Sequence, residues 1–187
     1  MLLALAISIV VAAGFAIRHG PCWLDFLVQR HPPGVIIHHT ATGATANGRP
    51  VNAALVDDSH KRRGWGLSNA HQTYHIGYHY LILPDGSVET GRPEWMTGAH
   101  CRGRNHYLGI ALVGNYSSKS NPEGSQQPAR PTPAQLHALH SLLLDLMNKH
   151  GFSPDDVHGH SEFRATECPG DRFPIAEVRR KIEETSR

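Results

Sequence analysis

One short segment restricts the fold of this chain more than any other. Residues 34–40 have the sequence Gly-Val-Ile-Ile-His-His-Thr, in which three β-branched apolar residues follow one another. Two prolines precede the segment, and a loop of small residues, 41–50, follows it. A short β-branched run between chain breakers is typical of a strand buried in a sheet. We therefore predict a core strand here, with two histidines at its carboxyl end.

The rest of the chain alternates between helical and strand patterns. A length of 187 residues fits one domain with a full hydrophobic core. Gly, Pro or polar residues bound each further element that we predict: a helix over 51–63, strands over 78–83, 88–92 and 108–113, a polar loop over 117–131, and helices over 132–150 and 174–187. This order predicts an α/β fold, a single domain with a central mixed β-sheet flanked by helices.

The helix predicted over 132–150 has the clearest boundary signals. Thr132 can cap its first turn, Pro133 suits the first helical position, and Gln135 completes a capping-box pattern. Four leucines then follow at helical spacing, and we expect them to form the buried face: Leu136, Leu139, Leu143 and Leu146.

The charge of the chain argues against a nucleic-acid partner. The formal net charge is only +2 with histidine counted as neutral, and the one dense basic cluster, residues 61–63, is interpreted as a solvated helix end. Histidine is unusually frequent, with 15 residues. Because histidine is the commonest metal ligand, this number favours a metal site without locating it.

An apolar run from Leu2 to Ile17 stands apart from the rest of the chain. Its 16 residues fall short of the about 20 that a membrane-spanning helix needs, and small residues over 11–16 suit a signal cleavage site. We predict a signal peptide or short membrane anchor over 1–20, a linker or peripheral segment over 21–33, and the folded domain over 34–187. A buried core helix is the third interpretation, and the lack of Lys or Arg before the run weakens the first. We expect an exported, monomeric protein, periplasmic or extracellular, with a membrane tether through residues 2–17 if the segment is retained.

The chain has three cysteines, Cys22, Cys101 and Cys168. An odd number cannot be fully paired within one chain, so at least one thiol stays free, binds metal or pairs between chains. A bridge between Cys22 and Cys101 would fit an oxidising compartment.

The segment 158–170 carries the most informative chemistry. It is polar and ends in Pro-Gly, so we predict a surface loop. His160 and Cys168 lie eight positions apart within it, and both residue types are good zinc ligands. A stable site needs a third ligand, for which His38 at the end of the first strand is the best candidate. Taken singly, each histidine is more often a satisfied surface residue, and the spacing alone does not decide.

Several further motifs occur in a fixed order along the chain. They are 35–41 (Val-Ile-Ile-His-His-Thr-Ala), 77–80 (Gly-Tyr-His-Tyr), 84–86 (Pro-Asp-Gly), 98–100 (Gly-Ala-His), 105–110 (Asn-His-Tyr-Leu-Gly-Ile), 132–135 (Thr-Pro-Ala-Gln), 159–160 (Gly-His) and 166–170 (Thr-Glu-Cys-Pro-Gly). Over about residues 34–174, this set resembles the amidase family shared by phage-type lysozymes of the N-acetylmuramoyl-L-alanine amidase kind and animal peptidoglycan recognition proteins. The shared order is more specific than any single motif.

The resemblance implies a site and a reaction. It implies that His38, His160 and Cys168 bind Zn²⁺, that Tyr78 is the active-site tyrosine, and that Thr166 is a second catalytic position. It also implies a hydrolase that cleaves the amide between N-acetylmuramic acid and L-alanine in peptidoglycan or a smaller muropeptide. Zinc in such a site polarises the carbonyl and activates the attacking water.

Four more residues are assigned to the substrate cleft: His39, Trp65, His100 and Asn105. For His100 and Asn105, loop-stabilising hydrogen bonds are an equal alternative, since both lie in polar loops between strands. For Trp65, which follows the first predicted helix, the alternative is a residue that caps the core.

Two other functions are weighed against the enzyme. Some members of the family keep the fold and bind peptidoglycan without cutting it, and these typically lack the cysteine, so Cys168 favours an active enzyme. A structural zinc site in an interaction protein usually has four protein ligands. The sequence offers candidates for a fourth ligand: His39, His79, His100 and Cys101.

Overall fold

The computed structural model describes residues 31–186 of the chain. The predicted signal or anchor segment, Cys22 and most of the predicted linker lie outside this range, so the expectations placed on them stay predictions. In the part of the chain that is described, no helix has both the length and the apolar character needed to cross a membrane.

Five strands form the central sheet, in the order β7-β6-β8-β1-β9. Their bounds are β1 Val35–His39, β6 Tyr80–Ile82, β7 Val88–Thr90, β8 Leu108–Leu112 and β9 Val157–Gly159. β1 pairs in parallel with β8 and β9, and β8 pairs in parallel with β6. Only β7 is antiparallel, because it is the return arm of the hairpin that begins with β6. The mixed sheet predicted from the sequence is confirmed, and β1 is buried along its whole length.

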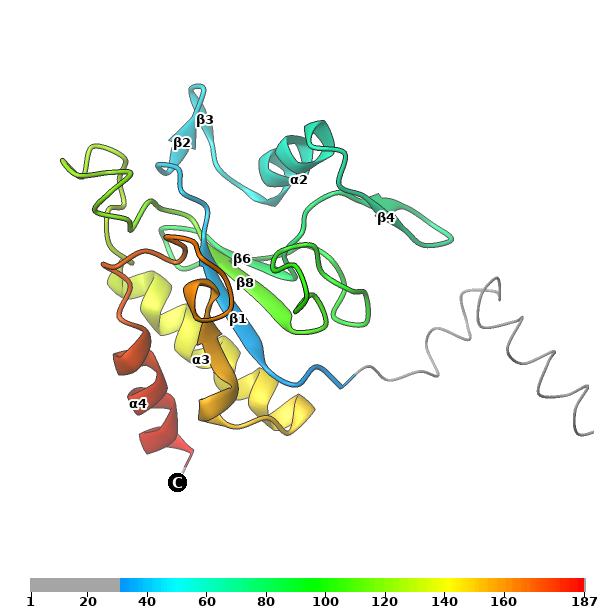
Figure 1. Ribbon diagram of the computed structural model, residues 1–187, viewed down its shortest axis with the longest axis vertical. Coiled ribbons are helices and arrows are strands. Elements are labelled where there is room, and N and C mark those ends of the chain that lie inside the picture. The colour runs from blue at the N-terminus through cyan, green and yellow to red at the C-terminus, as the bar shows by residue number, and fades with distance from the viewer. Residues whose placement is uncertain (1–30, 187) are drawn as a thin grey trace, which may run out of the picture.

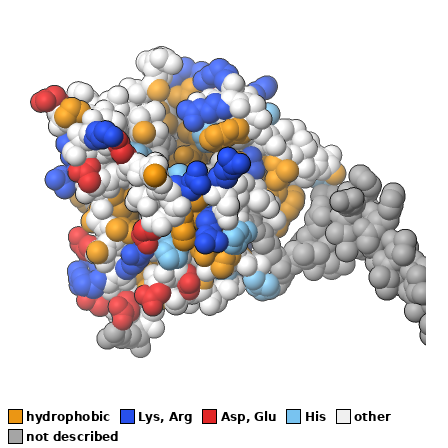
Figure 2. All heavy atoms as spheres, viewed as in Figure 1, with side chains coloured by type: hydrophobic (Ala, Val, Ile, Leu, Met, Phe, Trp, Pro, Cys, Tyr) orange, Lys and Arg blue, Asp and Glu red, His pale blue; other side chains and the backbone are white. Residues whose placement is uncertain are grey.

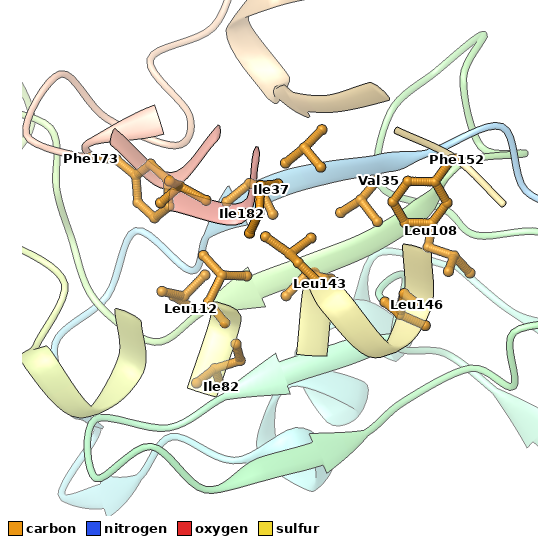
Figure 3. Packing of buried hydrophobic residues seen from close by; sticks show 14 of the residues in the cluster. Val35, Ile37, Ile82, Leu108, Leu112, Leu143, Leu146, Phe152, Phe173 and Ile182 are labelled. Carbon is orange, nitrogen blue, oxygen red and sulfur yellow. The ribbon is translucent and has the colours of Figure 1, made fainter. Parts of the chain in front are cut away.

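Helices cover both faces of this sheet (Figure 1). The three α-helices are α2 Ala53–Arg62, α3 Pro133–His150 and α4 Ile175–Thr185. Alternate strand residues face opposite sides, so Ile110 packs with α3 and α4 whereas Ala111 packs on the α2 side. In Figure 3, Leu143 of α3 and Ile182 of α4 lie against Ile37 of β1. Burial of each such aliphatic side chain contributes roughly 1.5–3 kcal/mol to stability.

The predicted start of α3 is confirmed in atomic detail. The Thr132 hydroxyl accepts from the Gln135 backbone N–H at 3.0 Å, and the Gln135 side chain accepts from the Thr132 backbone N–H at 3.0 Å. The same glutamine donates to the carbonyl oxygens of Ile82 and Val113, at 3.1 and 2.9 Å. A capping residue of α3 therefore also ties the helix to the carboxyl ends of β6 and β8.

The sequence interpretation missed the shortest elements. These are the hairpins β2–β3 (Thr45–Ala46 and Arg49–Pro50) and β4–β5 (Leu67–Ser68 and Thr73–Tyr74), strand β9, and the 3₁₀ turns η1 (Pro154–Asp156) and η2 (His160–Glu162). The segment 158–170 was predicted to be loop throughout, but its first two residues belong to β9. Three residues that include a histidine and a glycine carry no strand signal of their own, and their pairing with β1 makes the strand.

Candidate metal centre and its cleft

Two neighbouring parallel strands bring the predicted ligands to one edge of the sheet. Ile37 of β1 pairs with Gly159 of β9, so the residues that follow them, His38 and His160, lie side by side at the carboxyl ends. Cys168 returns to the same place on the loop after η2, where the backbone N–H of Ser161 donates to the Cys168 carbonyl oxygen at 2.8 Å. Long-range pairing, not local spacing, therefore assembles the group.

The ligand atoms of His38, His160 and Cys168 all lie within 4.8 Å of one another. The distance from His38 Nδ1 to Cys168 Sγ is 3.5 Å, and the ring centroids of His38 and His160 are 4.5 Å apart. Within residues 31–186, no other group of three or more His, Cys, Asp or Glu side chains converges in this way. The structure thus brings together the three residues predicted to bind zinc.

The electrostatic surroundings favour the neutral form of each member. Burial, followed by the neighbouring His100 and His160, holds the pKa of His38 well below its usual value of 6.5. Burial also lowers the pKa of His160 and raises the pKa of the Cys168 thiol to about 12. The backbone N–H of His39 opposes that rise by donating to Cys168 Sγ at 3.4 Å. Three atoms that can each bind a metal therefore face one another, and no carboxylate is among them. This arrangement is expected where a cation completes the group.

A cleft of about 850 Å³ opens above the three residues. Its lining includes Arg63 and Trp65, together with Lys119, Ser120 and the loop 165–168. Trp65 is 37% exposed, and the Arg63 guanidinium lies 5.5 Å from the centre of its ring. Trp65 therefore lies on the cleft, where the sequence interpretation placed it.

Tyr78 lies beside the metal group with its hydroxyl unused by the fold. Its ring centroid is 5.2 Å from that of His38 and 5.5 Å from that of His60, and the residue lines the cleft. Burial, followed by the nearby Cys168, raises the pKa of Tyr78, so the hydroxyl keeps its proton. No hydrogen bond from a described residue is among the influences on the pKa of this hydroxyl.

Thr166 and His39 also line the cleft, each with a role in local structure. The Thr166 hydroxyl accepts from the Cys168 backbone N–H at 3.3 Å and so shapes the loop that carries the thiol. His39 lies on the face of β1 opposite to His38, as strand alternation predicts, and its Nδ1 accepts from the Tyr116 backbone N–H at 3.1 Å. Burial lowers the pKa of His39 to about 4, so its imidazole is neutral.

His100 and Asn105 differ in position. His100 lines the cleft behind His38, with its Nδ1 3.0 Å from His38 Nε2. The Asn105 side-chain oxygen accepts from the backbone N–H groups of His100 and Cys101, at 2.9 and 2.8 Å. Asn105 is not among the residues that line the cleft. Its hydrogen bonds match the loop-stabilising alternative.

Sequence reasoning did not single out the charged residues of the cleft walls. Arg63 belongs to the cluster interpreted as a solvated helix end, and it does follow the last residue of α2. Glu167 accepts from Ser117 Oγ at 2.6 Å and pairs with Lys119 at 3.0 Å. Figure 2 shows Lys and Arg side chains over α2 and across the centre of this face, whereas acidic side chains gather on the α4 side. Arg63 could have been predicted to line the cleft, because it lies two positions before Trp65, which was assigned to it.

Fold and site together define a class of protein, an α/β domain with a three-donor cleft at the carboxyl edge of a mixed sheet. A family model described as N-acetylmuramoyl-L-alanine amidase matches residues 28–171. The chain therefore belongs to the N-acetylmuramoyl-L-alanine amidase family, and the family predicted from the sequence is confirmed.

Individual relatives come from phages, bacteria and animals. An endolysin of Klebsiella phage KP32 is 33% identical over 147 residues, which cover 78% of this chain and 85% of the endolysin. The solved amidase LysC from Clostridium intestinale URNW is 34% identical with a TM-score of 0.65, covering 82% of this chain and 86% of LysC. The solved Drosophila PGRP-LB is 29% identical with a TM-score of 0.59, covering 80% of this chain and 81% of PGRP-LB. These similarities confirm the predicted fold, which both kinds of protein share.

Proposed function

We propose that this chain is a zinc-dependent hydrolase that cleaves the amide bond between N-acetylmuramic acid and L-alanine in peptidoglycan. The observation that carries the proposal is the convergence of His38, His160 and Cys168 at the floor of an open cleft. Membership of the amidase family, with phage endolysins among the relatives, supports the substrate class.

The donor set fits zinc. Two neutral imidazoles and one thiolate are typical zinc ligands, and in a tetrahedral site a nitrogen and a sulfur ligand lie about 3.5 Å apart. His38 Nδ1 and Cys168 Sγ are 3.5 Å apart. No fourth His, Cys, Asp or Glu among the described residues joins the group. A set of three protein ligands supports a catalytic site over the structural-zinc alternative.

When bound, zinc supplies Lewis-acid chemistry, because it polarises a carbonyl and lowers the pKa of water. Tyr78 carries a protonated hydroxyl on the cleft wall, so it can donate a hydrogen bond to negative charge that develops on the substrate oxygen. Thr166 holds the loop that carries Cys168 and presents a short hydroxyl that can orient a substrate group. Trp65 and His39 offer an aromatic wall and a neutral imidazole to the bound substrate.

The second candidate is a protein that binds peptidoglycan without cutting it. Relatives named as peptidoglycan recognition proteins give this candidate its support. The complete ligand group favours the enzyme, since a pure binding site has no need for three metal donors beneath its cleft.

One experiment separates the two candidates. Purified protein is incubated with insoluble peptidoglycan, and the supernatant is assayed for peptides with a new amino-terminal L-alanine, while zinc is measured on the protein. We expect about one zinc per chain, release of such peptides, loss of release after chelation, and recovery on adding zinc. Binding to the pellet without release would favour the recognition protein. Full activity after complete demetallation would overturn the role of zinc.

A further inference from the structure

His100 is hydrogen-bonded through both nitrogens of its ring. Nδ1 lies 3.0 Å from Nε2 of His38, and Nε2 lies 3.1 Å from the carbonyl oxygen of Tyr107. The side chain is only 9% exposed, and its ring meets that of His38 edge to face at a centroid distance of 5.0 Å. The three residues therefore form a chain that runs from the metal group to the backbone just before β8.

The surrounding backbone holds the His100 ring in this orientation. Two glycines leave the space that the ring fills, because a Cβ on Gly98 would lie 2.4 Å from His100 Cδ2 and a Cβ on Gly109 would lie 2.6 Å from it. The backbone N–H of His100 is held by the Asn105 side-chain oxygen at 2.9 Å. Any side chain at either glycine would collide with the ring, and the two hydrogen bonds of the ring nitrogens set its orientation.

The position of each proton follows from one partner that can only accept. A carbonyl oxygen carries no proton, so His100 Nε2 must donate to Tyr107. In a neutral imidazole the other nitrogen then has a lone pair, so His100 Nδ1 accepts from His38 Nε2. With its proton on Nε2, His38 has a lone pair on Nδ1, the nitrogen that faces Cys168 Sγ. The chain of hydrogen bonds thus selects one of two tautomers of His38.

We propose that His100 is a positioning residue that fixes His38 in the tautomer whose Nδ1 binds the metal. The inference rests on the proposed function, because it concerns the same metal centre. It assigns to His100 a role beyond lining the substrate cleft. The Tyr107 carbonyl then serves to hold the proton of His100 on Nε2. Outer hydrogen bonds of this kind orient a ligand imidazole and raise its basicity, and their loss typically weakens metal affinity about 10- to 100-fold.

Zinc affinity of two substitutions at one position tests the proposal. His100→Leu fills the same space without any hydrogen bond, and we expect zinc to bind about 10- to 100-fold more weakly. His100→Asn places an amide oxygen close to the position of Nδ1, and we expect it to restore most of the affinity. Competition with a chromophoric chelator measures the dissociation constants without any substrate. Equal affinity of His100→Leu and the parent, or no rescue by His100→Asn, would overturn the proposal.

His79 provides a matched control. It is also a buried histidine, 1% exposed, and its ring centroid is 5.8 Å from that of His100. Its Nδ1 accepts from the Gly109 backbone N–H, and its Nε2 donates to the Met96 carbonyl oxygen, each at 2.9 Å. We expect His79→Asn to lower thermal stability but to bind zinc like the parent. If His79→Asn lost as much zinc affinity as His100→Leu, the loss would reflect a general disturbance of the structure around the metal group. That result would count against the proposal.

A spectroscopic measurement on the parent needs no substitution. Long-range ¹H–¹⁵N correlation spectra of the zinc-loaded protein distinguish the two tautomers of each histidine. We expect protonated Nε2 on both His38 and His100, with zinc on His38 Nδ1. Zinc on His38 Nε2 would refute the inference while leaving the zinc enzyme intact. Failure of the parent to bind zinc at all would instead overturn the proposed function, and this inference with it.

Discussion

Two polar clusters in this molecule use histidine in opposite ways. In the metal-centre cluster, His38, His160 and Cys168 each turn a metal-binding atom toward the other two, and no carboxylate joins them. In a second cluster, which we call the Glu94 cluster, Tyr80, Lys149 and His150 all direct their polar atoms to the carboxylate of Glu94. The second cluster ties the segment after β7 to the carboxyl end of α3.

The difference lies in what each cluster needs from outside. The Glu94 cluster combines donors with an acceptor, so its members satisfy one another and it acts as a clamp. The metal-centre cluster brings together three atoms that can each bind a metal and has no carboxylate, so a cation completes it. Convergence alone is therefore a poor sign of function, whereas convergence of like groups without a counter-charge is a good one. Substitutions in the two clusters should affect different properties of the protein.

The largest expected effect is that of Cys168→Ala. It removes one of the three proposed metal ligands, so we expect loss of zinc and a fall in peptide release of at least about 100-fold, more than the loss of an outer hydrogen bond produces. Cys101→Ala is the matched control, since Cys101 is a buried cysteine outside the ligand group. Metal analysis and the peptidoglycan assay measure both variants. Parent-level cutting by Cys168→Ala would remove the distinction between the clusters.

Tyr78→Phe should show the next largest effect. The change removes only a hydroxyl that makes no hydrogen bond to any described residue, so folding and zinc content should be unchanged. We expect kcat to fall about 100- to 1,000-fold, as for the loss of one donor to a developing oxyanion. Steady-state kinetics on a soluble muropeptide measure it. A kcat near that of the parent would show that Tyr78 only lines the cleft.

Glu94→Gln should lower stability and leave activity unchanged, the opposite of the two preceding variants. The substitution weakens hydrogen bonds from Tyr80, Lys149 and His150, so we expect the free energy of unfolding to fall by about 1–3 kcal/mol. Zinc affinity and kcat should stay at the parent level. Urea unfolding, followed beside a zinc titration, tests both statements. A loss of zinc affinity in this variant would mean that the two clusters are coupled.

The smallest effect concerns pH. Burial disfavours the charged form of Glu94, but hydrogen bonds from Tyr80, Lys149 and His150 outweigh it and lower its pKa below the usual 4.5. A carboxyl whose pKa is lowered in the folded state adds stability above its unfolded pKa and loses it as pH falls through the folded value. We expect the parent to lose more unfolding free energy than Glu94→Gln between neutral pH and pH values below 4.5. Urea unfolding of both proteins at each pH measures these losses. Equal losses of unfolding free energy in the two proteins would show that Glu94 is not involved.

The elements with local signals were predictable from the sequence. β1 follows from its β-branched run, and α3 follows from Thr132 and Gln135, whose capping bonds join residues three positions apart. β9 was not predictable, because its three residues become a strand only by pairing with β1. The metal group shares this limit. Spacing suggested His160 with Cys168, the strand end made His38 a candidate third ligand, and the ordered family motifs made it a named one.

The roles of single residues depended even more on distant partners. The bond between His100 and His38 joins residues 62 positions apart, so the sequence left His100 between two interpretations. The Glu94 cluster left no signal, since Glu94 and His150 are 56 positions apart. The residue types indicated which chemistry is available. Which of those residues come into contact depends on how the strands pair in the folded sheet.

The pairing of β9 with β1 also sets the time at which the metal centre can exist. His38 and Cys168 are 130 positions apart, and β9 is the last strand along the chain and lies at the edge of the sheet. A nascent chain carries His38 early, yet it lacks two of the three ligands until residues 160–168 have left the ribosome. Translation runs from the amino terminus, so the segment that completes the ligand group is made long after His38. Until that segment has reached His38, the growing chain has no complete ligand group.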